Sequence, residues 1–169
     1  MKKTRNLVFL SLLIALNIIL TRFGSIQTPI VRIGFGFLPL ALASMMFGPI
    51  LGGAAAAISD ILGMMIYPSG AYFPGFTLTA FISGALYGIF LYEKPKSIPR
   101  IILSVLTVTI AADIILNTLW LNMITGKAIY VLLTTRLVSN SIMLPIKVII
   151  ISLVWKALYS FTKPIFLSR

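Results

Sequence analysis

The sequence predicts an all-α integral membrane protein, built as a single bundle of six transmembrane helices. Of the 169 residues, 59% are hydrophobic and only 10% are charged, which is too little charge to cover a water-soluble domain of this length. Long apolar stretches also recur along the whole chain. Because 169 residues are too few for two such bundles, we expect one domain over residues 1–169.

Six hydrophobic stretches are separated by turn residues such as Gly48-Pro49 and Pro95. The second stretch is short for a bilayer core of ~30 Å, and Pro39 is expected to distort it. The last stretch is long and contains Pro145, a candidate for a kink. The expected spans are Leu7–Arg22, Ile33–Phe47, Pro49–Ile66, Pro74–Leu91, Arg100–Leu121 and Val131–Tyr159.

The distribution of lysines and arginines predicts the orientation of the bundle. With six spans both termini lie on one side, which collects nine of the 14 cations against four on the other. The remaining cation, Lys147, falls inside the sixth span. The positive-inside rule then places both termini in the cytoplasm of a multi-pass cell-membrane protein. In this setting the net charge of +11 indicates contact with anionic lipids of the bilayer, and no role in binding nucleic acid.

The absence of two residue types excludes several kinds of chemistry. The chain has no cysteine and no histidine, which excludes disulfides, thiolate nucleophiles, Cys/His metal sites and histidine-based triads. Its only carboxylate side chains are the scattered Asp60, Glu93 and Asp113, and no GxxxxGK[ST] loop is present to bind ATP. We therefore expect a protein that is not an enzyme and that holds neither a cofactor nor a metal ion.

Three arginines lie on the side where the orientation rule gives no reason for cations. Arg22, Arg32 and Arg136 fall at or near outer helix ends, and the first two bracket one short loop. Each of them alone is explained equally well by a side chain that snorkels to lipid phosphates. Because three occur together, we favour an anion-binding mouth.

The fifth span carries a polar face. Asp113, Asn117 and Trp120 are spaced i, i+4, i+7, which places them on one side of an α-helix. This face offers a carboxylate, an amide and a broad aromatic surface. A structural salt bridge would explain neither the asparagine nor the tryptophan, so we favour a ligand-binding role for the face.

The sixth span carries further polar groups on one face. Asn140 follows Arg136 by four residues, and Lys147 follows it by eleven. A charge inside a span costs ~3 kcal/mol on insertion scales, so each needs a partner or a task. For Lys147 we favour a structural salt bridge with Asp60 or Asp113 that holds helices together.

Aromatic and small residues complete the pattern. The turn segment between the third and fourth spans contains Tyr67, Tyr72, Phe73 and Phe76, which indicates either a belt at the membrane interface or a cover over a flat aromatic solute. Small residues are spaced four apart in the first span and crowd the start of the third and the middle of the fourth. Such steps permit close contact between helices in lipid.

Three stretches resemble a known family. They are Met46–Ala54 (MFGPILGGA), Ser59–Gly63 (SDILG) and Phe73–Ala80 (FPGFTLTA), and they are similar to the substrate-binding (S) components of energy-coupling-factor (ECF) vitamin transporters. The run FPGFTLTAF with SGALYG after it is most similar to the folate-specific members. The resemblance also extends to the chain length, the six expected spans and the basic cytoplasmic ends.

The resemblance implies a high-affinity binding subunit without catalytic activity. It would capture folate on the extracellular side and deliver it through a coupling module, composed of a membrane-embedded T subunit and two cytoplasmic ATPases. The family docks on the T subunit through an AxxxA step in its first span, and here Ser11 and Ala15 stand in that place.

The chemistry of folate suits the polar residues of this chain. Its pterin edge suits Asp60 or Asp113 with a neighbouring asparagine, and its glutamate suits cations at the mouth. Aromatic side chains suit the faces of its rings. The candidate binding residues are Arg22, Phe23, Arg32, Asp60, Tyr67, Tyr72, Phe76, Asp113, Asn117, Trp120, Arg136 and Asn140.

Three other functions compete with this reading. An S component for another vitamin, such as pantothenate, would share parts of the same motif. An intramembrane enzyme acting on polyprenyl phosphates would use the cations to hold phosphate, but it would also need clustered acids or a histidine. A purely structural membrane subunit would leave the outer arginines and aromatic residues unexplained.

Overall fold

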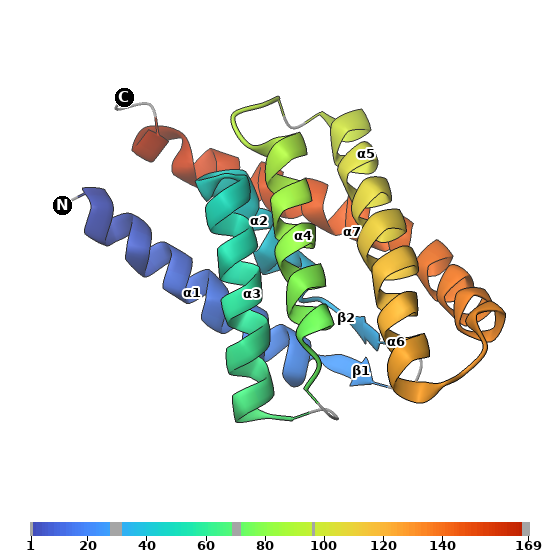
Figure 1. The fold of residues 1–169 in the computed structure, drawn as a ribbon. Coiled ribbons are helices and arrows are strands. Elements are labelled where there is room, and N and C mark those ends of the chain that lie inside the picture. Colours follow the sequence, from blue (N-terminus) through green and yellow to red (C-terminus); the bar gives the residue numbers. More distant parts are fainter. Residues whose placement is uncertain (1, 28–31, 69–71, 96, 167–169) are drawn as a thin grey trace.

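The computed structural model describes residues 2–27, 32–68, 72–95 and 97–166, and within them it leaves out the side chains of residues 2–3, 26–27, 32–33 and 158–166. The described chain is helical apart from one short antiparallel hairpin, β1–β2, in which Ser25 pairs with Gly34 (Figure 1). The elements are α1 (Lys2–Arg22), β1 (Ser25–Gln27), β2 (Arg32–Gly34), α2 (Phe37–Phe47), α3 (Pro49–Ile66), α4 (Pro74–Leu91), α5 (Ile98–Val108), η1 (Thr109–Leu116), α6 (Asn117–Thr125) and α7 (Ile129–Phe166).

In the part of the chain that the structure describes, five helical segments are long and apolar enough to cross a membrane. They are α1, α3, α4, the continuous run from α5 through η1 to α6, and α7. The expected span Ile33–Phe47 is wrong at its start, because Ile33 and Gly34 belong to the hairpin and α2 begins only at Phe37. With 11 residues, α2 is shorter than the other five.

The two prolines singled out from the sequence sit in continuous helix. Pro39 is the third residue of α2, where a missing N–H breaks no helical hydrogen bond. The expected distortion of α2 by this proline therefore has no basis in the hydrogen-bond pattern. Pro145 lies within α7, which continues on both sides of it as one helix of 38 residues.

The expected bounds of the third and fourth spans are those of α3 and α4. Each helix begins with a proline, Pro49 or Pro74, at the position where proline's fixed backbone angle suits a helix start. Gly48 has φ +90° between α2 and α3, a conformation that favours glycine, and its N–H donates to the Ser44 carbonyl. These are local signals, and they set the ends of the helices.

Glycines bring α3 and α4 into close contact. A Cβ atom on Gly84 would lie 2.6 Å from the Gly52 carbonyl oxygen, and one on Gly53 would lie 2.9 Å from the Phe81 carbonyl oxygen. Both distances are shorter than real Cβ contacts, so the two backbones approach as closely as they do because these side chains are absent. The predicted use of small residues for helix packing is confirmed for this pair.

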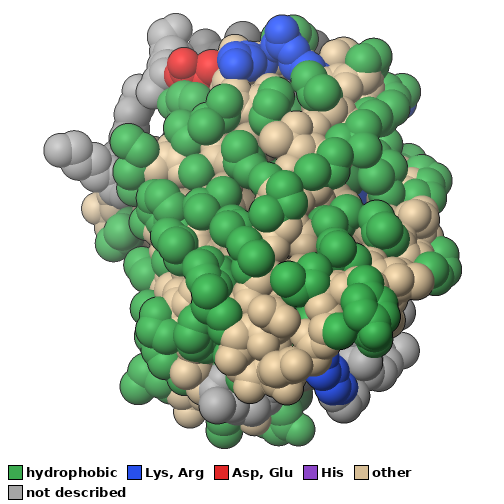
Figure 2. Space-filling view, turned by 45° about the vertical axis from the view of Figure 1, so that its right-hand side comes forward, with side chains coloured by type: hydrophobic (Ala, Val, Ile, Leu, Met, Phe, Trp, Pro, Cys, Tyr) green, Lys and Arg blue, Asp and Glu red, His purple; other side chains and the backbone are tan. Residues whose placement is uncertain are grey.

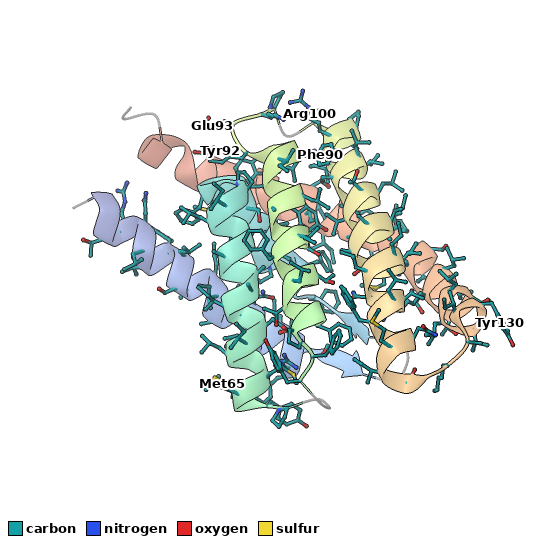
Figure 3. The ribbon with its side chains drawn as sticks, in the orientation of Figure 1. Met65, Phe90, Tyr92, Glu93, Arg100 and Tyr130 are labelled. Carbon is teal, nitrogen blue, oxygen red and sulfur yellow. The ribbon has the colours of Figure 1, made fainter. Side chains whose placement is uncertain are left out.

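Two ends of the bundle can be distinguished in Figure 1. The hairpin and the α3–α4 and α6–α7 connections lie at one end, which we call the hairpin end, and the α2–α3 and α4–α5 connections lie at the other. Figure 3 shows Glu93 and Arg100 beside the α4–α5 connection, and Met65 projecting at the hairpin end of α3. On the face shown in Figure 2, hydrophobic side chains cover the middle and charged ones gather near the edges, as expected for a surface in contact with lipid.

Candidate functional site

A cavity of about 280 Å³, lined by charged, polar and apolar side chains, lies among the helices. Both halves of the chain contribute to its lining. The N-terminal half contributes residues from α1, the hairpin, α2, α3 and α4, and the C-terminal half contributes residues from α5, η1, α6 and α7. Three cations and two carboxylates are among the described residues that line it, namely Arg22, Asp60, Asp113, Arg136 and Lys147. Such a concentration of charge inside a membrane bundle is typical of a functional site.

Arg22 and Asp60 form one of the two ion pairs that the described residues make in the cavity. The Arg22 Nη2 atom lies 3.4 Å from Asp60 Oδ1, and the arginine side chain is almost fully buried. Gly63 makes room for it, because a Cβ there would lie 2.6 Å from Arg22 Nε. The second carboxylate oxygen of Asp60 accepts a hydrogen bond of 2.9 Å from the Thr77 hydroxyl. This network therefore joins the hairpin ends of α1, α3 and α4.

Lys147 and Asp113 form the second ion pair. The Lys147 ammonium donates to Asp113 Oδ2 at 2.8 Å, which links α7 to η1. A salt bridge of Lys147 with one of the two aspartates is the arrangement that the sequence favours for this lysine. Asp113 is not sealed off by the contact, since its side chain is 29% exposed. The pair therefore both joins two helices and presents a carboxylate to the cavity.

A π-helical segment determines where Asp113 lies. Across η1 the hydrogen bonds widen, and the Asn117 N–H donates to the Ala112 carbonyl five residues earlier. In an α-helix Asn117 would instead bond the Asp113 carbonyl. That carbonyl accepts a bond of 2.8 Å from Arg136 Nη1 in the structure. The π-turn thus brings the backbone of η1 within reach of an arginine on α7.

The wider turn also changes which residues share a face. Asp113 and Asn117 line the cavity, but Trp120 does not. Each residue of a π-turn rotates by less than in an α-helix, so the i, i+4, i+7 spacing no longer places three residues on one side. Trp120 packs against Phe73, with ring centroids 5.6 Å apart, and its Nε1 donates to Thr79 Oγ1 at 2.9 Å. These two contacts of Trp120 hold α6 against α4.

The cavity lining includes six of the twelve candidate binding residues and leaves out five. The six that line it are Arg22, Asp60, Asp113, Asn117, Arg136 and Asn140. The five outside the lining are the aromatic residues Phe23, Tyr67, Tyr72, Phe76 and Trp120. The twelfth, Arg32, has its backbone in β2, and its side chain lies outside the described part of the structure.

The aromatic residues near the hairpin end are mostly solvent- or lipid-facing. Phe23 and Tyr67 contact each other with ring centroids 5.8 Å apart, and they are 67% and 52% exposed. Tyr72 is also half exposed, and its hydroxyl lies 3.2 Å from that of Thr77, which bonds Asp60. These rings therefore lie largely on the outer surface, and none of the three lines the cavity.

The sequence does not single out several lining residues, including two aromatic ones and an asparagine. Phe37 and Tyr87 are the aromatic members of the described lining, and Asn17 adds an amide from α1. An asparagine inside a hydrophobic span is a detectable signal, because an uncommitted amide is costly in lipid. The two aromatic residues carry no such signal, since rings are common in apolar helices.

Several buried polar atoms of the lining have no hydrogen-bond partner among the described residues. They are Asn17 Oδ1, Tyr87 Oη, Asn117 Oδ1 and Arg136 Nε. Buried polar groups are nearly always paired in native proteins, because leaving one unpaired costs ~1–3 kcal/mol. The cavity therefore offers hydrogen-bonding groups and a cation to a molecule with a polar ring and an acidic group.

Ser11 and Ala15 lie on the exposed surface of α1 and do not line the cavity. The Ser11 hydroxyl donates to the Leu7 carbonyl of its own helix at 2.9 Å, so it needs no outside partner. The two residues leave a small, smooth surface on α1.

Comparisons with known proteins agree with this architecture. The family model of the substrate-specific component of ECF transporters matches residues 5–155. The folate transporter FolT of Clostridium novyi (strain NT) is 53% identical over 156 residues, covering 92% of this chain and 91% of that protein. FolT of Leuconostoc mesenteroides is 35% identical over 151 residues, covering 86% and 81%.

A solved structure is similar over nearly the whole chain. It is described as the crystal structure of FolT bound with folic acid, and it matches with a TM-score of 0.84 and 38% identity, covering 88% of this chain and 91% of that one. The relatives are named as transporters and not as enzymes. The resemblance found in the sequence is thereby confirmed, and this chain belongs to the family of substrate-specific components of ECF transporters.

Proposed function

We propose that this chain is the folate-binding subunit of an ECF-type vitamin importer. The observation that carries the proposal is the polar cavity, whose described lining holds three cations against two carboxylates. Both carboxylates are paired, Asp60 with Arg22 and Asp113 with Lys147, so Arg136 is the cation that an acidic ligand would neutralise. The relatives named as folate transporters, and the similar structure bound with folic acid, support folate as that ligand.

The arrangement of charges favours one orientation of folate. Arg22 lies at the hairpin end in the network with Asp60 and Thr77, whereas the Arg136 and Lys147 side chains, from positions eleven residues apart on α7, both bond Asp113 deeper in the bundle. An elongated ligand would place its glutamate near the arginines and its pterin deeper. Arg32, on the hairpin, is a further candidate for a glutamate carboxylate, since its backbone lies at this end.

Asp113 is a better candidate than Asp60 for a hydrogen bond to the pterin. Asp60 is already engaged by the Arg22 guanidinium and the Thr77 hydroxyl, at the end where we place the glutamate. Asp113 lies beside Asn117, whose amide oxygen has no partner among the described residues, and Asn140 lines the same region. Phe23, Tyr67, Tyr72 and Phe76 would then contribute to an outer cover, with Trp120 supporting it from α6.

The membrane topology follows from the same proposal. We expect α2 to complete a second, short crossing together with the hairpin, which makes six crossings in one domain with both termini in the cytoplasm. The excess of cations on the side of the termini supports this orientation. The hairpin end, with the cavity arginines, would then face the outside of the cell, where folate is captured.

Delivery requires partners. As an S component, the chain would dock on a membrane-embedded T subunit driven by two cytoplasmic ATPases, and the small α1 surface at Ser11 and Ala15 is the proposed contact. Ala15→Leu adds bulk where two helices must approach closely, so folate uptake with the coupling module should fall while binding to the isolated chain stays nearly constant. If binding and uptake fall together, Ala15 packs within the chain and the docking assignment is wrong.

The proposed ligand can be tested on the purified chain. We expect equilibrium titration in detergent to show folate binding without ATP and far tighter than ~1 mM, which corresponds to ~4 kcal/mol. Thiamine, a cation, and pantothenate, which lacks a ring, should not compete at equal concentration. A chain that binds pantothenate and not folate would show that the vitamin has been misassigned. A pterin-like absorbance in the protein purified from cells would support the proposal independently.

A further inference from the structure

Tyr87 combines an apolar ring environment with an unexplained polar group. The residue lies on α4, is 1% exposed and belongs to the hydrophobic core that also contains Leu91 and Val108. A phenylalanine would fill this core equally well. The hydroxyl is the part that packing does not explain, because among the described residues it has no hydrogen-bond partner.

The position of Tyr87 relates this hydroxyl to the cavity. Tyr87 lines the cavity, together with Val108 and Lys147 from two other segments. It follows Thr77, which bonds Asp60 near the hairpin end, by ten residues on α4, a distance of ~15 Å along the axis. Tyr87 therefore belongs to the deep part of the cavity, away from the Thr77–Asp60–Arg22 network at the hairpin end.

We propose that the Tyr87 hydroxyl hydrogen-bonds the polar edge of the ligand's heteroaromatic ring, which makes Tyr87 a specificity-determining residue for that ring. The inference rests on the proposed function, since it takes folate as the ligand. The deep end receives the neutral pterin if the arginines near the hairpin end hold the glutamate. The pterin's ring nitrogens and carbonyl oxygen are acceptors for a phenol O–H, and ligand binding would supply the partner that the hydroxyl lacks.

The inference predicts opposite effects on stability and on binding. Tyr87→Phe removes a buried hydroxyl without changing the shape of the core, so the melting temperature of the folate-free protein should stay equal or rise. Folate affinity should fall about tenfold, as expected for one lost hydrogen bond to a buried group. If the hydroxyl instead made a purely structural hydrogen bond, Tyr87→Phe would show the reverse, which is a lower melting temperature with unchanged folate affinity.

Thr118 supplies a matched control. It is 2% exposed and its hydroxyl also has no partner among the described residues, but it does not line the cavity. Thr118→Val should therefore leave folate affinity unchanged, with an equal or higher melting temperature. This comparison separates the loss of any buried hydroxyl from the loss of one that contacts ligand.

The experiment measures equilibrium binding of folate and of 6-hydroxymethylpterin, which has the ring but no glutamate, together with the melting temperature of each folate-free variant. Tyr87→Phe should lower the affinity for both ligands by a similar factor. Unchanged folate affinity in Tyr87→Phe, or a lowered melting temperature in the folate-free variant, overturns the inference. A wild-type chain that binds no folate contradicts the proposed function itself, and the ring contact with it.

Discussion

Two pairs of helices in this molecule are joined in opposite ways. The α3–α4 pair is joined by glycine backbones, which approach so closely that a Cβ atom added to Gly84 would lie 2.6 Å from the Gly52 carbonyl oxygen. The η1–α7 pair is joined by long charged side chains, through the Lys147–Asp113 ion pair and the bond from Arg136 to the Asp113 carbonyl. The first contact leaves no room for a side chain between its helices, whereas the second is made by side chains that line a cavity.

The two kinds of contact differ in what they offer to a ligand in a small membrane bundle. Backbone contact through glycines provides rigidity without any polar group that could be shared with a ligand. Side chains that reach across a gap can exchange a partner, since carboxylates and guanidinium groups form several hydrogen bonds at once.

The glycine contact should be the least tolerant of change. Gly84→Leu places a side chain where even one carbon atom meets the α3 backbone, so we expect a loss of ~3 kcal/mol or more in stability and a low yield of folded protein. Thermal unfolding in detergent measures this. Ile89→Leu on the exposed side of the same helix is the control and should unfold like wild type. A normally stable Gly84→Leu protein would show that α3 and α4 do not pack through these glycines.

The protein should lose less stability when both members of the ion pair between η1 and α7 are replaced than when only one is. Lys147→Met leaves the Asp113 carboxylate without its cation, and we expect a loss of ~2–3 kcal/mol, below the ~3–5 kcal/mol of a sealed pair because Asp113 is 29% exposed. Adding Asp113→Asn should recover most of the stability but not folate binding. If the double variant remains as unstable as the single one, the pair is not what destabilises Lys147→Met.

The arginine without a carboxylate partner should act on binding more than on stability. Arg136→Ala is expected to weaken the binding of folate by ~1–3 kcal/mol and the binding of 6-hydroxymethylpterin by less, because only folate carries the glutamate. Arg22→Ala provides the contrast, since it leaves Asp60 unpaired and should lower the melting temperature as well. Equal losses for the two ligands in Arg136→Ala would mean that this arginine shapes the cavity and does not bind the carboxylate.

The smallest effect is expected at Trp120. Trp120→Phe keeps a ring against Phe73 but removes the bond from Nε1 to the Thr79 hydroxyl, which should cost ~1 kcal/mol of stability. Folate affinity should not change, because Trp120 does not line the cavity. A clear loss of affinity at unchanged stability would restore Trp120 to the ligand-binding face that the sequence suggests.

The parts of the fold that the sequence predicts well depend on local signals. Pro49 and Pro74 mark helix starts, and Gly48 marks the turn before the first of them, so the bounds of α3 and α4 follow from neighbouring residues. The hairpin β1–β2 has no comparable signal. Its residues Ile33 and Gly34 continue an apolar stretch, which is why they were assigned to a span.

The cavity depends on choices between partners that lie far apart in the chain. The sequence identifies Asp60, Asp113, Arg22 and Lys147 as charges in need of a partner or a task. It does not reveal that Arg22 pairs with Asp60 and Lys147 with Asp113, because the helix arrangement decides this. Trp120 was placed on the polar face by α-helical spacing, and the π-turn of η1, which no local residue pattern indicates, is what turns it away.

The proposed function requires that folate occupies the cavity between the two halves of the bundle. The most direct measurement is the structure of this chain with folate bound. We expect folate inside the cavity, with its pterin near the Asp113 carboxylate and Tyr87 and its glutamate on the side of Arg136 that faces the hairpin end. Folate bound outside the cavity, among Phe23, Tyr67 and Tyr72, would contradict it, and so would a pterin at the Arg22–Asp60 pair with the glutamate beside Lys147.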